Sequence, residues 1–209
     1  GKTWEVKNQA NEKTQLPIDG ENGYPSTTTI LEWLRSKDDF FGVKEGCAEG
    51  DCGACTVVIV EELQGELVYK SVTSCLLFLP YLHGKQLLTI EHLSKLNKGS
   101  YRLHPIQEIL AAYNGSQCGY CTPGIVMSLF AYYKNDEKEE EIPYSLSGNL
   151  CRCTGYESIR EAAVEILSID VADEFSLMER QVISSLKILK SEIKAISTEN
   201  YFQPFSLVE

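Results

Sequence analysis

The sequence has no long hydrophobic run. Its longest apolar stretches, such as Cys75–Pro80 and Thr56–Val60, are far shorter than the roughly 20 residues of a membrane-spanning helix. Residues Gly1–Gln15 lack the apolar segment and small-residue cleavage site of a secretory signal peptide. No glycine-rich motif of the P-loop or dinucleotide-binding type is present. These absences argue against a membrane protein, a secreted protein and a nucleotide-binding protein of those two types.

Basic residues are few relative to acidic ones, with 19 Lys and Arg against 30 Asp and Glu and a net charge of −11. Nucleic-acid backbones and anionic membranes attract basic surfaces. A chain this acidic is therefore not expected to bind either of them. Histidine is also scarce, and His83, His92 and His104 lack the spacing of metal ligands. With 43% hydrophobic and 23% charged residues, the composition is that of a globular protein that stays in solution or docks other proteins.

Cysteine, in contrast, is abundant: the 209 residues include eight cysteines, in two groups of four in separate halves of the chain. The first group is Cys47, Cys52, Cys55 and Cys75, and the second is Cys118, Cys121, Cys151 and Cys153. We expect a cytoplasmic location, where thiols stay reduced and clustered cysteines indicate metal or redox chemistry rather than disulfides. Two small domains are therefore predicted, each built around one site.

The first half of the sequence predicts strands and one helix. A hairpin is expected from Trp4–Val6 and Leu16–Ile18, and further strands from Thr56–Glu61, Leu67–Thr73 and Gln86–Ile90. Thr29 and Glu32 have capping-box spacing, and Ile30, Leu31 and Leu34 then form the apolar stripe of a short helix. A small mixed sheet with one covering helix fits this order.

The second half predicts helices. His104-Pro105 and Thr122-Pro123 each place proline in the first turn of a helix, and Ile159–Leu167 carries another apolar face. Two antiparallel helix pairs are expected to pack together. Beyond Ser168, the segment Phe175–Ile196 is long and amphipathic, with Val182, Leu186, Leu189 and Ile193 on one stripe. A helix packed on its own domain and a linker helix leading to another domain both fit this segment.

The first cysteine group has the spacing C-x4-C-x2-C with a fourth cysteine later, which is typical of plant-type ferredoxins that bind a [2Fe–2S] cluster. One tight loop supplies three thiolates, and Gly46, Gly50 and Gly53 allow that loop to bend and to bring N–H groups towards sulfur. The alternative is a four-cysteine zinc site, but such sites generally use two short cysteine pairs.

The second cysteine group consists of a C-x2-C pair and a C-x-C pair, each ahead of a predicted helix. Helix N-termini favour anionic thiolates, and Arg152 between two of the cysteines offsets further negative charge. This spacing alone leaves a [2Fe–2S] cluster and zinc both open. A thioredoxin-type dithiol is disfavoured because the surrounding βαβ pattern is missing.

Three longer segments, Glu45–Thr56, Gln117–Gly124 and Gly148–Tyr156, together resemble the iron–sulfur portion of the xanthine oxidase family of molybdenum hydroxylases. Leu103–Gln107 also looks like the opening of that family's helical domain, and the likeness runs from about Thr27 to Leu167 in the family's order. The family carries two [2Fe–2S] clusters, so the resemblance favours clusters over zinc at both sites.

The resemblance implies the ligands and the neighbouring cofactors. The ligands would be Cys47, Cys52, Cys55 and Cys75 in a β-grasp ferredoxin-like domain, and Cys118, Cys121, Cys151 and Cys153 in a four-helix domain. By the same likeness, molybdopterin would lie beside the second cluster, near Gln117 and Cys153, and FAD beside the first. Tyr120 would stack on a cofactor or shield the cluster from water, and we favour shielding.

The predicted fold class is α+β in three parts. Residues 1–92 would form the ferredoxin-like [2Fe–2S] domain, and residues 93–170 the four-helix [2Fe–2S]-binding domain. Residues 171–209 would form a linker helix and the start of an FAD-binding domain, similar to the small subunit of bacterial xanthine dehydrogenase.

The expected function is electron transfer through both clusters from molybdopterin to FAD in a xanthine dehydrogenase-type enzyme that hydroxylates purines. The chain itself would carry no substrate site and no catalytic residue, and its partners would be a molybdopterin-binding subunit or domain and an FAD-binding domain. Alternatives are the iron–sulfur subunit of an aldehyde, carbon monoxide or N-heterocycle dehydrogenase, a non-enzymatic zinc-binding interaction module, and a free-standing redox sensor.

Overall fold

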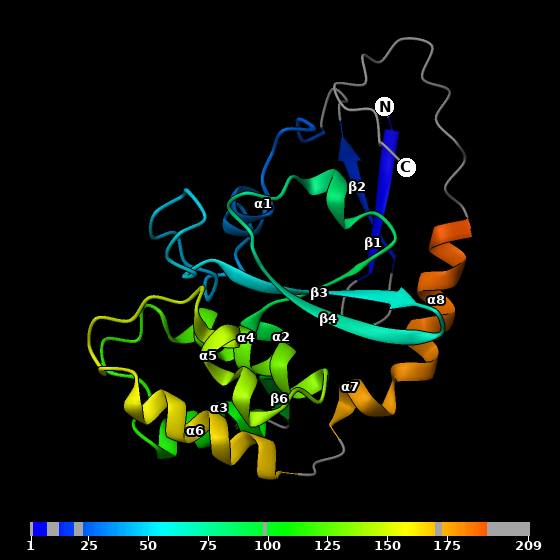
Figure 1. Ribbon diagram of the computed structural model, residues 1–209. Coiled ribbons are helices and arrows are strands. Elements are labelled where there is room, and N and C mark those ends of the chain that lie inside the picture. The colour runs from blue at the N-terminus through cyan, green and yellow to red at the C-terminus, as the bar shows by residue number, and fades with distance from the viewer. Residues whose placement is uncertain (1, 8–12, 19–22, 98–99, 170–172, 192–209) are drawn as a thin grey trace, which may run out of the picture.

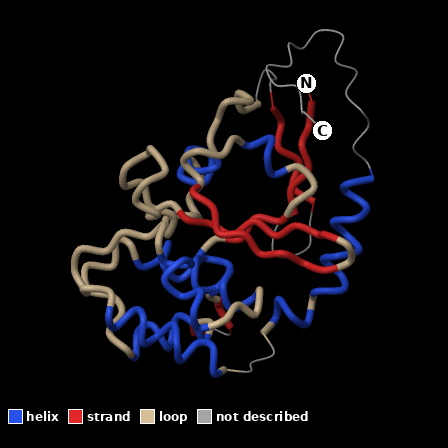
Figure 2. Tube along the Cα trace, viewed as in Figure 1, coloured by secondary structure: helices blue, strands red, loops and turns tan. Residues whose placement is uncertain are grey.

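In the α+β fold of the chain, most of the helices lie on one side of a mixed sheet (Figures 1 and 2). The computed structural model describes residues 2–7, 13–18, 23–97, 100–169 and 173–191. Among these residues no helix has both the length and the apolar character needed to cross a membrane.

The sheet has five strands in the order β2-β1-β5-β3-β4. Their bounds are Lys2–Lys7 for β1, Lys13–Ile18 for β2, Thr56–Leu63 for β3, Glu66–Thr73 for β4 and Gln86–Leu88 for β5. Strands β1 and β5 run parallel, and the other neighbours are antiparallel. The expected hairpin and the later strands are confirmed. The last strand is shorter than predicted, because Thr89 already caps helix α2 (Ile90–Leu93). A second hairpin, β6 (Lys95–Asn97) with β7 (Ser100–Arg102), was not predicted.

Strand β3 is buried on both faces of the sheet. Val57 and Ile59 pack into a core with helix α1, whereas Val58 and Val60 pack into a core with the helices on the other side. Over Val57–Val60 the strand is covered on both faces and has no solvent side for polar residues, which explains this apolar run.

Helix α1 (Ile30–Arg35) and the 3₁₀ helix η1 (Leu79–Leu82) cover one face of the sheet. The predicted capping box is confirmed: the Glu32 N–H donates to the Thr29 hydroxyl at 3.1 Å, and the Thr29 N–H donates to the Glu32 carboxylate at 2.7 Å. The box satisfies two backbone donors that the first helical turn leaves free.

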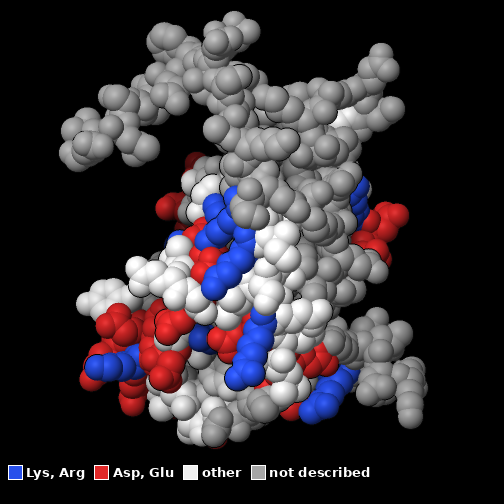
Figure 3. Space-filling model, turned by 90° about the vertical axis from the view of Figure 1, so that its right-hand side faces the viewer, with Lys and Arg blue, Asp and Glu red and all other residues white. Residues whose placement is uncertain are grey.

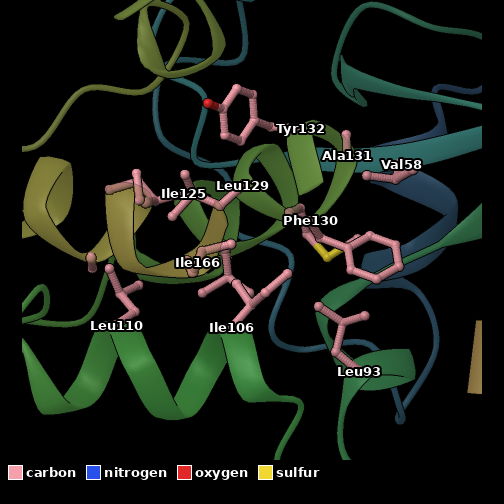
Figure 4. Packing of buried hydrophobic residues seen from close by; sticks show 14 of the residues in the cluster. Val58, Leu93, Ile106, Leu110, Ile125, Leu129, Phe130, Ala131, Tyr132 and Ile166 are labelled. Atoms are coloured by element: carbon pink, nitrogen blue, oxygen red, sulfur yellow. The ribbon is translucent and has the colours of Figure 1, made fainter. Parts of the chain in front are cut away.

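Helix α4 (Thr122–Lys134) lies against β3 and β4 on the other face of the sheet. Helices α3 (Pro105–Ala112), α5 (Ile142–Leu146) and α6 (Glu157–Ser168) pack around α4, and the 3₁₀ helix η2 (Glu139–Glu141) directly precedes α5. Both predicted proline starts are confirmed, because Pro105 and Pro123 stand in first turns. Ile106 and Leu110 of α3 point towards Ile166 of α6 and Leu129 of α4 (Figure 4). The same core contains Val58 and Val60 of β3, so the sheet and the helices are held by one continuous core.

The segment expected as one helix from Phe175 is divided into α7 (Glu174–Leu177) and α8 (Glu179–Ser191). Val182, Leu186 and Leu189 form a small core with Leu67 of β4, as the predicted stripe requires. Lys190 Nζ lies 3.1 Å from the Glu62 carboxylate of β3. Acidic and basic side chains are interspersed on the face that carries α8 (Figure 3). Ile193 and the segment 201–209 lie outside the described residues.

Asp173 joins α7 to the helices below the sheet. Its buried carboxylate lies 3.1 Å from Lys134 Nζ and 3.3 Å from His104 Nε2, and it accepts the Ser176 N–H at 2.7 Å. His104 Nδ1 accepts the N–H of Ile106, so the ring proton sits on Nε2 and faces Asp173. Burial alone would raise the pKa of Asp173, but the hydrogen bonds from His104 and Ser176 and the charge of Lys134 hold it well below its ordinary value.

We predict that Asp173→Asn lowers the free energy of unfolding at neutral pH by about 3 kcal/mol, because it leaves the buried Lys134 without its counter-charge. The folded-state pKa lies below the ordinary 3.8, so the carboxylate stabilises the fold fully above that pH and progressively less below it. Urea denaturation should therefore show that the difference in unfolding free energy between the unmodified protein and Asp173→Asn becomes smaller as the pH falls below 3.8. Asp136→Asn, at an exposed carboxylate, should change little at any pH; a gap that does not depend on pH would contradict the prediction.

Candidate metal centres

The β3–β4 ladder brings two cysteines of the first group together. Cys55 directly precedes β3 and Cys75 follows β4, and Thr56 pairs with Thr73 at that end of the hairpin. The N–H and the hydroxyl of Ser74 donate to the Cys55 carbonyl at 3.3 and 2.7 Å. Cys55 and Cys75 are 2% and 8% exposed, and their thiols form a hydrogen bond.

A tight loop before β3 supplies the other two cysteines. The N–H groups of Asp51 and Cys52 both donate to Cys47 Sγ at 3.3 Å. A Cβ on Gly46 would lie 2.7 Å from Cys52 Sγ, so this position has no room for a side chain. Gly46 therefore allows the backbone to approach sulfur closely, as predicted for the loop glycines.

Backbone N–H donors lower the pKa of these thiols, whereas burial raises it. The Glu49 N–H is the main cause that lowers the pKa of Cys47 to about 7, with further donation from Asp51 and Cys52. Burial, followed by the hydrogen bond with the Cys55 thiol, raises the pKa of Cys75 to about 11. Cys47 also forms a hydrogen bond with the Cys52 thiol. The group thus consists of an inner pair and a partly exposed outer pair.

The second group lies between the helices. Cys121 is the N-cap residue of α4, so this cysteine pair lies at a helix N-terminus as predicted. Cys151 and Cys153 lie in the loop that leads to Tyr156, the N-cap residue of α6. Cys121 forms a hydrogen bond with the buried Cys151 thiol, and the exposed Cys118 forms one with the exposed Cys153. This group also has an inner and an outer pair.

Local donors and burial set the thiol pKa values in this group as well. Burial would raise the pKa of Cys151, but the hydroxyl and N–H of Thr154 and the N–H of Cys153 outweigh it and lower the pKa to about 7. Burial, and then the Cys151 thiol, raises the pKa of Cys121 to about 12. The Tyr120 N–H is the main cause that lowers the pKa of Cys118, whereas the Cys118 thiol raises that of Cys153.

The thiols of both groups are arranged in pairs. Within the described part of the chain, no three His, Cys, Asp or Glu side chains converge on the position of a single metal ion. Two neighbouring pairs of thiols fit a group with two irons and four cysteine ligands, which is the composition of a [2Fe–2S] site. The donor set and its pairing therefore suit such a cluster at each site.

The two cysteine groups are neighbours, although they come from different halves of the chain. The Leu150 N–H donates to the Cys52 carbonyl at 2.9 Å, and the Tyr120 hydroxyl donates to the Glu45 carbonyl. In Figure 1 both loops lie on the same side of the molecule, one cyan and one yellow. One hydrogen bond thus links Cys52 directly to Leu150, the residue before Cys151.

The side chain of Asn149 joins the two cysteine loops by hydrogen bonds, at a contact that we call the junction. The side chain is 4% exposed, and its Nδ2 donates to the Gly53 carbonyl at 3.1 Å and to the Thr56 hydroxyl at 3.2 Å. Its Oδ1 accepts the Ser128 hydroxyl at 2.6 Å. Every polar atom of this buried amide group thus has a partner, as a buried polar group requires.

Glycine is required at this junction. A Cβ on Gly53 would lie 2.1 Å from the Gly148 carbonyl oxygen, and Gly53 has a φ of +69°. A Cβ on Gly124 of α4 would lie 2.2 Å from the Gly53 carbonyl oxygen. Real Cβ atoms do not approach that closely, so both positions depend on the absence of a side chain.

The remaining predicted site residues lie at the surface. Gln117 is exposed beside Cys118, and Arg152 is exposed between its two cysteines. Tyr120 is 49% exposed and links the two loops, a role that the sequence did not indicate. The role of Asn149 was also missed: it stands in the segment Gly148–Tyr156, but nothing in the sequence identifies its partner near residue 53.

Comparison with protein families gives two matches. A model described as a 2Fe-2S iron-sulfur cluster binding domain matches residues 20–79, and one described as a [2Fe-2S] binding domain matches residues 89–164. The first range contains all four cysteines of the first group, and the second range contains all four of the second group.

Curated relatives are considerably longer than this chain. Xanthine dehydrogenase of Blastobotrys adeninivorans is 47% identical over 140 residues, which cover 65% of this chain and 10% of that protein. Xanthine dehydrogenase/oxidase of Rattus norvegicus is 47% identical over 136 residues, which cover 63% of this chain and 10% of that protein. The chain therefore spans about a tenth of the length of these relatives.

Two solved structures share the fold. Quinoline 2-oxidoreductase from Pseudomonas putida matches with a TM-score of 0.62 and 26% identity, covering 80% of this chain and 94% of that chain. Aldehyde oxidoreductase from Desulfovibrio desulfuricans matches with a TM-score of 0.65 and 25% identity, covering 80% of this chain and 17% of that chain.

The fold, the paired thiols and these matches define an iron–sulfur protein with two [2Fe–2S]-binding domains in series. Over 65% of its length the chain is similar to xanthine dehydrogenase, and its fold is similar to that of quinoline and aldehyde oxidoreductases.

We predict that Gly53→Ala is much more destabilising than Gly65→Ala. Both residues have positive φ, so each substitution costs about 1–2 kcal/mol for the left-handed backbone, but a Cβ on Gly65 meets nothing within 4 Å. The clash with Gly148 should add about 1–3 kcal/mol at Gly53. Urea denaturation of the two variants measures the difference, and equal costs would show that the junction is not tightly packed.

Proposed function

We propose that the chain is the electron-transfer part of a xanthine dehydrogenase-type enzyme and passes electrons between molybdopterin and FAD through two [2Fe–2S] clusters. Each cluster, when bound, accepts and returns one electron at a time. The observation that carries the proposal is the adjacency of two four-thiol groups across the hydrogen bond from Leu150 to Cys52.

The proposed ligands are the eight cysteines that the sequence singled out. They are Cys47, Cys52, Cys55 and Cys75 for the first cluster, and Cys118, Cys121, Cys151 and Cys153 for the second. The pairing of the thiols and the N–H groups directed at Cys47 support this assignment, because N–H donors stabilise thiolate sulfur.

The residues between the two groups provide a short connection. The Leu150 N–H donates to the Cys52 carbonyl, and Cys151 follows Leu150 in the chain. Asn149 and Ser128 are buried at this point, 4% exposed each, and close the junction to solvent. A covalent path with one hydrogen bond thus joins a proposed ligand of each cluster.

The outer thiol pairs support contacts with cofactor-bearing partners. Cys118, Cys153 and Gln117 are exposed on the helical side, where we place the molybdopterin-binding subunit or domain. Leu150 and Tyr156, 50% and 38% exposed, lie beside that pair in the chain. Exposed apolar residues also flank the first group, with Phe41 before Cys47 and Leu76 and Phe78 after Cys75, and there we place the FAD-binding domain. Exposed apolar side chains of this kind are typical of docking surfaces.

We infer the domain arrangement from the same features. Residues 1–92 form the ferredoxin-like β-grasp domain, residues 93–170 the four-helix domain, and residues 171–209 a linker helix and the start of an FAD-binding domain. The helices α3, α4, α5 and α6 around one core support the second domain. Helix α8 packs against Leu67 of the sheet, as a helix that belongs to this unit does, so the assignment of the third part rests on the resemblance alone.

The substrate class that we propose is a purine, because the curated relatives are named xanthine dehydrogenase and are 47% identical. An aldehyde or an N-heterocycle is the second candidate, favoured by the titles of the two solved structures. We place the protein in the cytoplasm, where its eight cysteines, none of them in a disulfide, stay reduced.

We predict about four irons and four acid-labile sulfides per chain after anaerobic purification, since each [2Fe–2S] cluster takes four of the thiolates. Cys75→Ser should remove about half of both and leave the other cluster's EPR signal, and Cys151→Ser should do the reverse. About two zincs and no iron would contradict electron transfer and would leave a structural metal module. Ser145→Ala, at a hydroxyl bonded only to the Ile142 carbonyl among the described residues, is the matched control.

A further inference from the structure

The loop from Cys151 to Tyr156 closes on itself through the tyrosine hydroxyl. The Cys151 N–H donates to Tyr156 Oη at 2.7 Å. Tyr156 has a φ of +69°, in the left-handed region that a bulky side chain rarely enters. Such a conformation persists only where surrounding contacts enforce it, and here it directs the phenol back under Cys151.

The hydroxyl of Tyr156 is not needed for helix capping. Tyr156 is the N-cap residue of α6, but its side chain makes no cap hydrogen bond, and the helix receives only its carbonyl, which accepts the Arg160 N–H at 2.9 Å. The bond to Cys151 is therefore the contact that distinguishes tyrosine from phenylalanine at this position.

Thr154 contacts the sulfur of the same cysteine. Its Oγ1 accepts the Tyr156 N–H at 3.2 Å and lies 3.2 Å from Cys151 Sγ. Because the oxygen accepts at one lone pair, its own hydrogen is available to donate to sulfur. Two hydroxyl groups thus act on one cysteine, at its sulfur and at its N–H.

The two contacts have opposite electrostatic effects. A donor to the sulfur of a cluster ligand stabilises the more negative, reduced state, and such hydrogen bonds help to set cluster potentials. The phenol oxygen instead offsets the positive end of the Cys151 N–H dipole, which would otherwise stabilise added negative charge. Thr154 should therefore raise the reduction potential, and Tyr156 should lower it.

We propose that Thr154 and Tyr156 are positioning residues that tune the reduction potential of the cluster held by Cys118, Cys121, Cys151 and Cys153, in opposite directions. The inference rests on the proposed function, since it requires a cluster at these cysteines. It adds to that function a pair of residues that touch the ligand Cys151 without binding iron.

The test is a reductive titration of the full chain carrying both clusters, followed by EPR. Tyr156→Phe should shift the midpoint of the second cluster upwards, with several-fold more of it reduced at a fixed potential. Thr154→Val should shift the midpoint downwards, and Thr154→Ser, which keeps the hydroxyl, should restore it. The first cluster should not change in any of these variants.

Tyr144→Phe is the matched control. Tyr144 stands on α5 and is 75% exposed, and its hydroxyl makes no hydrogen bond within the described part of the chain. This variant should keep both midpoints. Iron and sulfide analysis of the unmodified chain, performed first, tests the proposed function separately. Fewer than about four irons would reject the two-cluster function, and a chain without the second cluster would overturn the roles of Thr154 and Tyr156 as well.

Unchanged midpoints in both Tyr156→Phe and Thr154→Val would overturn the proposal. Shifts of the same sign would overturn the role given to Tyr156, because they would reflect loosening of the loop rather than two opposed contacts. Loss of the second cluster in Tyr156→Phe would likewise overturn tuning by Tyr156 and make it an assembly residue. Opposite shifts confined to the second cluster would support the proposal.

Discussion

The rest of the site depends on the close approach of two backbones at Gly53. Its carbonyl accepts from Asn149, and its Cα faces the carbonyl of Gly148 at a distance that admits no side chain. Gly124 of α4 meets the same carbonyl from another direction. Because this contact is held by directional hydrogen bonds and by the absence of Cβ atoms, it fixes one loop against the other more precisely than apolar packing alone. The spacing of the two cysteine groups follows from it.

Strand β3 gives this junction its rigid support. The strand begins directly after Cys55, and its side chains alternate between the core with α1 and the core with the helices. Thr56, its first residue, also accepts a hydrogen bond from Asn149. A movement of the first cysteine loop relative to the second would therefore disturb two cores at once. Binding sites benefit from such support because their geometry then varies little.

The two sites share one design despite their different surroundings. One arises where a loop meets the end of a β-hairpin, and the other where two helices begin, yet each has an inner pair and an outer pair of thiols. The inner pairs connect to the protein core, and the outer pairs reach the surface. On the proposed function, this arrangement suits electron transfer between two partners, because the outer thiols face the partners while the inner thiols lie within the protein.

The sequence by itself determined the local features of this protein. The capping box of Thr29 and Glu32, the proline starts of α3 and α4 and the cysteine spacing all depend on residues a few positions apart, so short-range chemistry reveals them. The break at Met178 and the hairpin β6–β7 were missed. Only the tertiary structure decided which thiols pair, that Asn149 joins the two loops, and that Tyr156 turns back to Cys151. Those contacts join distant segments or need an unfavourable backbone, and both are settled by packing and burial rather than by local preference.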